Sequence, residues 1–182
     1  MTHPEKSSRQ ITRIKHKEQR VGIFIDIQNL YHSSKNLYHA RVNYRELIKE
    51  VLGGRKLIRA IGYVVKSEAD GAGSAESSFF DALEKAGIEL RMKDLQVFAG
   101  GMKKADWDVG MAVDAIRMAS FLDTVVLVTG DGDFVPLVEY LKWGLGREVE
   151  VASFGRSTSA KLKEAADSFV DLGELPRIIM KK

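Results

Sequence analysis

The amino-acid sequence predicts a single α/β domain in which helices cover both faces of a mainly parallel sheet. From Val21 onward, apolar runs enriched in β-branched residues alternate with segments whose apolar residues recur at helical spacing. Strands that alternate with helices are joined by right-handed crossovers, which produce a parallel sheet covered on both sides. The 182 residues contain no internal repeat and no linker rich in Pro, Gly or Ser, so we expect one domain.

Each expected element rests on a local signal. Asn43 can cap a helix, because Glu46 follows three residues later and glycines stand at its end. Gly87 ends a second helix, and Pro136 lies in the first turn of another, where proline is tolerated. The strands are apolar runs such as TVVLVTG. In chain order we expect strand 21–26, helix 43–54, strand 56–65, helix 75–87, one or two extended pieces in 88–98, helix 108–121, strand 124–130, helix 133–144, strand 147–154 and helix 158–167.

The composition excludes several classes of protein. Cysteine is absent, which rules out disulfides and thiolate metal sites and favours a cytoplasmic location. No apolar run reaches the roughly 20 residues that a membrane helix needs, so no membrane partner is expected. The first 20 residues are too polar for a signal peptide.

The positive charge is concentrated at the amino terminus. Residues 1–20 carry six basic and two acidic side chains, a net charge of +4, whereas residues 21–182 carry 22 basic and 23 acidic side chains. We expect residues 1–20 to be a flexible basic arm, residues 21–176 the folded domain and residues 177–182 a basic tail. The arm either improves solubility or contacts phosphates.

Acidic side chains follow two of the expected strands. Asp26 ends the strand 21–26, and Asp131 and Asp133 follow the strand 124–130 with one glycine between them. Binding sites in open parallel sheets form beyond the carboxyl ends of the strands, so these carboxylates are expected at one edge of the sheet.

Each of these aspartates also has a purely structural interpretation. Asp133 is placed to cap the following helix, Asp131 could be a turn residue, and Asp26 could accept hydrogen bonds from backbone amides. In the last case Asn29 would be a helix cap. Three acidic groups at one edge must each find a partner, however, and this favours a shared cation.

Two further aspartates lie on the expected helix 108–121. Asp114 has apolar neighbours on almost every side, so we expect it to be neutral, paired or close to a cation. Asp108 begins the helix, where it could bind an ion or, like Asp106, act as a cap. The two positions differ by about 120° around a helix and roughly 9 Å along it, so we expect Asp108 to be the ligand and Asp114 a supporting residue.

Clustered carboxylates, with no cysteine and only four histidines in the chain, indicate a hard cation. Mg²⁺ prefers oxygen ligands near 2.1 Å and keeps several waters. Beside a phosphodiester, such an ion polarises the phosphoryl oxygen and lowers the pKa of bound water. The pattern therefore predicts hydrolysis of a phosphodiester.

Four segments together resemble the NYN-domain, LabA-like branch of the PIN-like nucleases. The similarity covers roughly residues 21–172, and its strongest parts are D-x-x-N after the first strand and T-G-D-x-D-F. The sequence departs from the family pattern at Ile27, where glycine is usual, and at Asp106-Trp107, where small or aliphatic residues are common. The four segments are FIDIQNL (24–30), KADWDVGMAVDA (104–115), VTGDGDFVPLV (128–138) and EAADSFVDL (164–172).

The resemblance implies a PIN-like doubly wound sheet and a ribonuclease that uses Mg²⁺ or Mn²⁺. Single-stranded RNA is the expected partner. The catalytic residues that it implies are Asp26, Asn29, Asp108, Asp131 and Asp133. The four aspartates would hold the metal, and Asn29 would orient water or a ligand carboxylate. Thr129 and Asp114 are expected to support this site.

Candidate substrate contacts lie near the same edge. Lys103 and Lys104 could neutralise phosphates, or they could be a solvated pair. Arg156 and Ser157 stand at a strand-to-helix junction whose free amides suit a phosphate, although Ser157 or Thr158 could simply cap the helix.

The aromatic residues divide in the same way. Tyr31 and His32 could stack on the bases of a single strand, and Trp107 could stack or pack. Tyr140 and Trp143 are expected to pack between helices.

Other functions remain open. The chain could be a regulatory module that binds RNA or protein and keeps the acidic pocket without turnover. A phosphotransfer enzyme is disfavoured, because Ile27-Gln28-Asn29 follow Asp26 where a D-x-D-x-T pattern would be needed. A dinucleotide-binding protein is disfavoured because no G-x-G-x-x-G follows the first strand. A homo-oligomer is possible.

Overall fold

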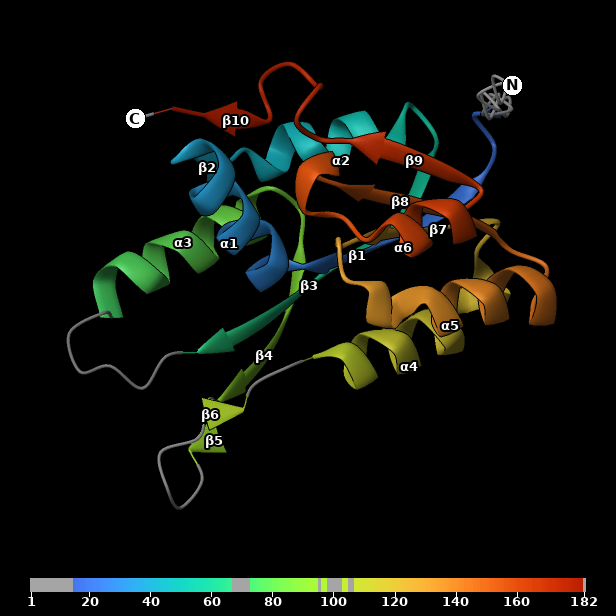
Figure 1. Cartoon of the computed structure of the whole chain (residues 1–182), viewed down its shortest axis with the longest axis horizontal. Coiled ribbons are helices and arrows are strands. Elements are labelled where there is room, and N and C mark those ends of the chain that lie inside the picture. Colours follow the sequence, from blue (N-terminus) through green and yellow to red (C-terminus); the bar gives the residue numbers. More distant parts are fainter. Residues whose placement is uncertain (1–14, 67–72, 95, 98–102, 105–106, 182) are drawn as a thin grey trace, which may run out of the picture.

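The computed structural model contains a six-stranded sheet in which every strand pair is parallel (Figure 1). It describes residues 15–66, 73–94, 96–97, 103–104 and 107–181. Numbered by their sequence order within this sheet, the strands lie in the order 3-2-1-4-5-6, which is a doubly wound arrangement. The predicted fold class is therefore confirmed. From edge to edge the strands are β4 (Glu89–Asp94), β3 (Lys56–Lys66), β1 (Arg20–Asp26), β7 (Thr124–Val128), β8 (Glu148–Ser153) and β9 (Ser168–Asp171).

Helices cover both faces of this sheet. Ile23 and Ile25 of β1 point into the core on one face, and Phe24 points into the core on the other, as the two-residue period of a strand requires. The first face carries α1 (Ile27–Tyr38), α2 (Tyr44–Leu52) and α3 (Gly73–Lys85), and the second carries α4 (Asp108–Met118), α5 (Val135–Glu139) and α6 (Ala160–Ala165).

Short elements complete the described part of the chain. The helical turns are η1 (Ala119–Phe121), η2 (Gly132–Phe134), the π-helical η3 (Tyr140–Gly144) and η4 (Gly155–Ser157). Two antiparallel pairs are formed by β2 (Arg41–Val42) with β10 (Ile179–Met180), and by β5 (Gln96–Val97) with β6 (Lys103–Lys104). None of the described helices has the length and apolar character needed to span a bilayer.

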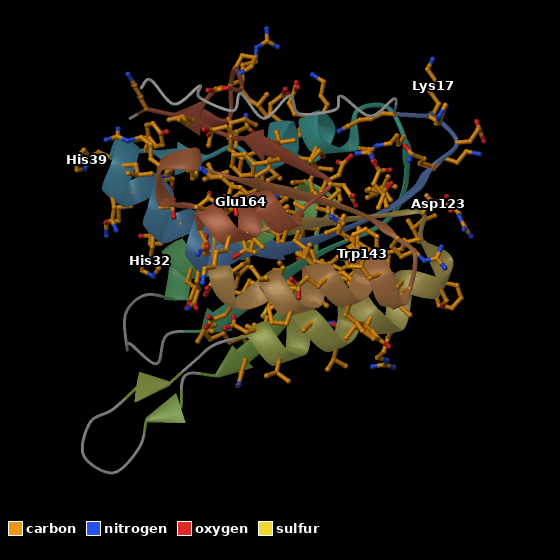
Figure 2. All side chains as sticks on the ribbon, turned by 45° about the vertical axis from the view of Figure 1, so that its right-hand side comes forward. Lys17, His32, His39, Asp123, Trp143 and Glu164 are labelled. Atoms are coloured by element: carbon orange, nitrogen blue, oxygen red, sulfur yellow. The ribbon has the colours of Figure 1, made fainter. Side chains whose placement is uncertain are left out.

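Several local predictions are confirmed. The Asn43 side chain accepts a hydrogen bond of 3.3 Å from the backbone N–H of Glu46, and α2 ends at Gly53 in the left-handed conformation (φ 58°). The helix predicted over 133–144 is present, although it consists of three helical types in succession. β9, in contrast, was not expected as a strand. The prediction that Tyr140 and Trp143 pack between helices is wrong, because Trp143 (Figure 2) is 82% exposed and Tyr140 is 49% exposed.

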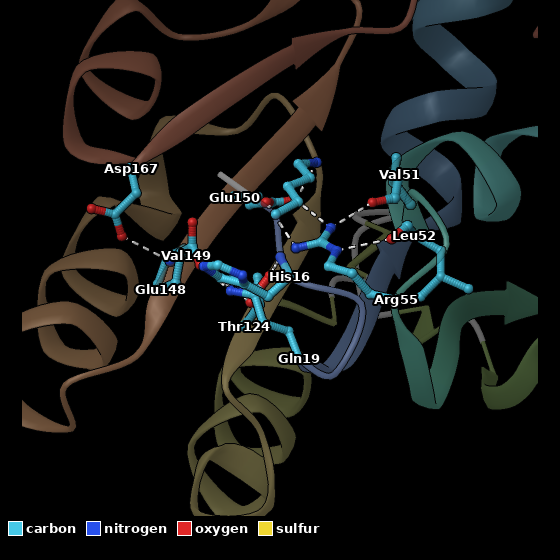
Figure 3. A network of polar contacts seen from close by, with 11 residues as sticks. His16, Gln19, Val51, Leu52, Arg55, Thr124, Glu148, Val149, Glu150 and Asp167 are labelled. Carbon is cyan, nitrogen blue, oxygen red and sulfur yellow. Dashed lines mark hydrogen bonds and ion pairs between the residues drawn. The ribbon is translucent and has the colours of Figure 1, made fainter. Parts of the chain in front are cut away.

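A buried ion pair lies at the end of the sheet opposite the carboxyl ends of the strands (Figure 3). The Arg55 guanidinium donates to both carboxylate oxygens of Glu150, at 3.0 and 2.8 Å, and each side chain is at most 1% exposed. Lys15 adds a third contact to Glu150 at 3.2 Å, and Gln19 bonds Glu148 at 2.8 Å. Residues 15–20 are therefore fixed to the folded domain, whereas the rest of the expected basic arm lies outside the described residues.

Candidate metal centre

The acidic residues lie where the strand order of the sheet reverses. β1 and β7 are neighbours, with Ile25 paired to Val128. The chain leaves β1 toward β3 on one side, and β7 leads to β8 on the other, so a crevice opens beyond their carboxyl ends. Asp26 ends β1, and Asp131 lies three residues beyond the end of β7.

Three carboxylates converge at this crevice. Asp108, Asp131 and Asp133 each offer one oxygen, and these three atoms lie within 4.8 Å of one another. Two oxygens bound to one Mg²⁺ at roughly 2.1 Å are ~3.0 Å apart when adjacent and ~4.2 Å apart when opposite. The three side chains can therefore hold one such ion after small movements. Asp108 and Asp131 are half-buried, and Asp133 is exposed.

Asp26 lies beside this group of three. It borders a cavity of ≈ 190 Å³ together with Asp108 and Asp131. The described lining of this cavity contains three carboxylates and no lysine or arginine. Its charge is thus suited to a cation.

Asp26 has a second role in the backbone. Its Oδ1 accepts a hydrogen bond of 3.0 Å from the backbone N–H of Asn29 and so caps α1. Its Oδ2 accepts from the Thr129 hydroxyl at 3.3 Å. Burial raises the pKa of Asp26 and the nearby Asp131 charge adds to this, while the bonds from Asn29 and Thr129 oppose it. A cation at the site would lower the pKa of Asp26 again, because a nearby positive charge stabilises the charged carboxylate.

Two hydrogen bonds from backbone N–H groups shape the turn that carries Asp131. The Thr129 hydroxyl accepts from the backbone N–H of Asp131 at 3.2 Å, and the Asn29 Oδ1 accepts from the N–H of Gly130 at 3.0 Å. A Cβ added to Gly130 would lie 2.9 Å from the carbonyl oxygen of Ser157, so only glycine lets the turn approach η4 this closely.

Two predicted helix caps, one after β1 and one after β7, are wrong. The Asp131 side chain caps η2 by accepting from the N–H of Asp133 at 2.9 Å, so Asp133 itself is not the cap. Asn29 is not a cap either, since Asp26 has that position. The carboxylate that caps is in each case the one closest to the strand end, because the helical turn begins directly after the strand.

Asp114 lies apart from the three converging carboxylates. The Tyr63 hydroxyl donates to its Oδ2 at 3.1 Å, and the Arg91 Nε lies 3.5 Å from the same oxygen. Burial, the Asp114 charge and this hydrogen bond raise the pKa of Tyr63. Asp114 is therefore paired, and its contact holds Tyr63 at the wall of the acidic cavity.

Trp107 forms another part of that wall. Its indole N–H donates to the Val64 carbonyl at 2.8 Å, and its ring lies 5.6 Å from the Tyr63 ring. A Cβ on Gly110 would lie 2.5 Å from the indole, so the glycine makes room for it. The ring packs and also borders the cavity.

Two residues of α1, Gln28 and the predicted substrate contact His32, also line the cavity. Sequence reasoning did not assign Gln28 a role. The signal was available, because the two residues are four positions apart and share one face of a helix. A helix here was expected only in the alternative in which Asn29 caps it, because the true cap of α1, Asp26, also ends the preceding strand.

The remaining candidate substrate contacts are more dispersed. Tyr31 is 47% exposed on α1. Arg156 is exposed on η4, where the Ser157 hydroxyl donates to the Phe154 carbonyl at 3.2 Å and bonds the Ser33 hydroxyl at 3.1 Å. Neither Ser157 nor Thr158 caps α6, whose N-cap position is Ser159. The side chains of Lys103 and Lys104 lie outside the described part of the chain.

Comparison with known proteins gives consistent matches. The model of the NYN domain family matches residues 20–173. The chain is 28% identical over 174 residues to the low amplitude and bright protein LabA of Synechococcus elongatus, covering 89% of this chain and 88% of that protein. A crystal structure of a protein of unknown function from Vibrio parahaemolyticus is 28% identical and has a TM-score of 0.81, covering 92% of this chain and all of the other.

Proposed function

Because the chain belongs to the NYN domain family, whose members are generally nucleases, we propose that it is a divalent-metal-dependent ribonuclease. One observation carries the proposal. Three carboxylate oxygens from two separate segments lie within 4.8 Å of one another, beside a cavity whose described lining has no basic side chain other than His32. An enzyme that hydrolyses phosphodiesters by metal-assisted catalysis needs such a site.

Asp108, Asp131 and Asp133 are the residues proposed to hold Mg²⁺ or Mn²⁺, with Asp26 completing the acidic wall. When bound, the cation would polarise the phosphoryl oxygen and lower the pKa of a water molecule that attacks phosphorus. No covalent enzyme intermediate is required.

The other residues position these acids. Thr129 bonds both the Asp26 carboxylate and the Asp131 backbone, and Asn29 holds the turn through Gly130. The carboxylates of Asp26 and Asp131 are thereby kept in one place before any ion binds. Such prior positioning lowers the reorganisation that the reaction requires.

RNA is proposed as the substrate on the basis of family membership and of exposed aromatic side chains near the site. Tyr31 stands on the helix that also supplies Gln28 and His32 to the cavity wall. Bases that are not paired can stack on such rings, so single-stranded RNA is the expected form.

The test is a cleavage assay with labelled single-stranded RNA and DNA, in Mg²⁺, in Mn²⁺ and with a chelator. We expect cleavage of RNA by the wild-type chain with either metal and a loss of at least a hundredfold for Asp131→Asn. Asp81→Asn is the matched control, since Asp81 is exposed on α3 and lines neither cavity. Equal cleavage by the wild type and Asp131→Asn would refute the proposal. Metal binding without any cleavage would instead favour a regulatory module.

A further inference from the structure

A second, larger cavity adjoins the acidic one. It has a volume of ≈ 1100 Å³ and is bounded by α1, α2 and α3 together with the carboxyl end of β3. Gln28 and His32 line both cavities, so the two lie next to each other along α1. We call this larger cavity the α1–α3 groove. Its volume is sufficient for a nucleoside, since ligand pockets commonly measure about 300–1,000 Å³.

Aromatic rings form much of the groove's lining. Phe79 lies 6.0 Å from Tyr44 and 6.1 Å from Phe80 between ring centroids, so the three rings make one continuous apolar wall. Tyr31, a residue that is 47% exposed, lines the groove, and its ring is in edge-to-face contact with His32. An exposed ring beside a hydrophobic wall is the kind of surface on which a planar base stacks.

The charges of the groove are opposite to those of the acidic cavity. Arg41, Arg45 and Lys85 line it and are exposed, and Glu76 is the one carboxylate in its described lining. The acidic cavity, in contrast, has three carboxylates. A polyanion whose scissile phosphate is neutralised by a cation in the small cavity would find basic side chains for its neighbouring phosphates along the groove.

We propose that the α1–α3 groove holds the unpaired base of a nucleotide next to the scissile phosphate, with Gln28 at its entrance contacting the base edge. This inference rests on the proposed function. Gln28, Tyr31 and His32 occupy positions i, i+3 and i+4 of α1, so the amide, the phenol ring and the imidazole lie on one face of the helix. A base in a duplex is stacked between its neighbours and cannot enter, so the groove selects single-stranded substrates.

The experiment measures binding separately from cleavage. Fluorescence anisotropy with Mg²⁺ is used on chains that carry Asp131→Asn, which keeps the RNA intact, with a short labelled single-stranded RNA and a series of RNAs that each lack one base. Tyr31→Ala is expected to weaken binding of the intact RNA on the order of tenfold. It should have little effect on binding of the RNA that lacks the base occupying the groove. Trp143→Ala is the matched aromatic control, because that ring is 82% exposed and lines neither cavity.

Two further variants sharpen the test. Arg45→Ala should weaken binding of every RNA in the series to a similar degree, whereas Arg117→Ala, an exposed arginine on α4, should not. Equal losses on intact RNA and on all the base-deficient RNAs for Tyr31→Ala would overturn the inference, as would equal affinity for a duplex. If base-dependent binding is found but the wild-type chain cleaves no RNA, the groove assignment stands and the ribonuclease proposal fails.

Discussion

The side-chain carbonyl oxygen of Asn29 accepts a hydrogen bond of 3.0 Å from the backbone N–H of Gly130. This contact joins the first turn of α1 to the turn after β7, and these two segments carry Asp26 and Asp131. It is a link between the two halves of the doubly wound sheet at the point where the acids meet.

Replacement of Asn29 by alanine should therefore loosen the site. The N–H of Gly130, a buried residue, loses its partner, which costs about 1–3 kcal/mol of unfolding free energy. For a chain of this size we expect a fall of several degrees in the midpoint of thermal unfolding, together with weaker Mn²⁺ binding. Asn36→Ala, on the exposed side of α1, is the control. Equal unfolding midpoints and Mn²⁺ affinities for both variants would contradict this role.

Replacement of Asp131 by asparagine should stabilise the metal-free protein. The substitution removes one of three neighbouring negative charges, and asparagine caps a helical turn about as well as aspartate does. In a chelator we expect an unfolding midpoint about 2–4 °C above that of the wild type for each kcal/mol gained. Addition of Mn²⁺ should raise the midpoint of the wild type more than that of the variant. A variant that is less stable in chelator and responds fully to Mn²⁺ would show that the acids do not repel one another.

Neutralising Glu150 should strongly destabilise the fold, because Glu150 is the buried partner of Arg55. Glu150→Gln leaves a buried guanidinium without its counter-charge, and such a loss typically costs about 3–5 kcal/mol. The double variant Arg55→Met/Glu150→Leu should recover most of this stability. The unfolding free energies of both variants can be measured by urea denaturation. The control is Glu89→Gln, which breaks an exposed pair with Arg59 and should cost less than about 1 kcal/mol. Similar losses for the two glutamates would be inconsistent with this account.

Asp123 predicts a dependence of stability on pH. The Arg20 side chain and backbone bond the Asp123 carboxylate and lower its pKa to about 2. The pKa of Asp123 is thus lower in the folded protein than its unfolded value of roughly 3.9. The pairing with Arg20 therefore stabilises the fold fully above about pH 3.9, and this stabilisation disappears as the pH falls through about 2. Both side chains are over one-third exposed, so screening by solvent keeps this stabilisation small. The difference in unfolding free energy between the wild type and Asp123→Asn should narrow at low pH, and a constant difference would exclude this pair as its source.

The basic arm should be tested with a cut after residue 14. Lys15 and Arg20 pair with Glu150 and Asp123, so removing all 20 residues would also remove contacts of the folded domain. Deletion of residues 1–14 removes three basic side chains and should reduce the salt slope of RNA binding by up to about 2. Mn²⁺ affinity should be unchanged. If the salt slope is unaltered, the arm does not contact phosphates.

The sequence was sufficient to predict the fold class and the edge at which the acids gather. Asp26 and Asp131 follow apolar runs, and parallel strands deliver their carboxyl ends to the same side whatever their order. It was not sufficient to show that β1 and β7 are neighbours, since strand order depends on contacts between residues about 100 positions apart. The caps were misassigned for a local reason. Asp26 ends β1 and directly precedes α1, and Asp131 caps the short turn η2, which begins at Gly132, one residue before the predicted cap Asp133.

The α1–α3 groove could not be predicted in the same way. Tyr31, Tyr44 and Phe79 come from three helices separated along the chain, and none of these segments shows a distinctive motif. Only the packing of the helices against one face of the sheet brings the rings together. Charge patterning was equally uninformative, because Arg41, Arg45 and Lys85 are ordinary surface positions until the groove is seen.

The central position of β1 also affects when the three-carboxylate cluster can form during synthesis. β1 is the first of the described strands to leave the ribosome, but its partner β7 begins 103 residues after Val21, at Thr124. At roughly 5–20 residues per second, the gap is on the order of 5–20 s. A nascent or prematurely terminated chain that lacks β7 also lacks Asp131 and Asp133, so it cannot assemble the three-carboxylate cluster that these residues form with Asp108.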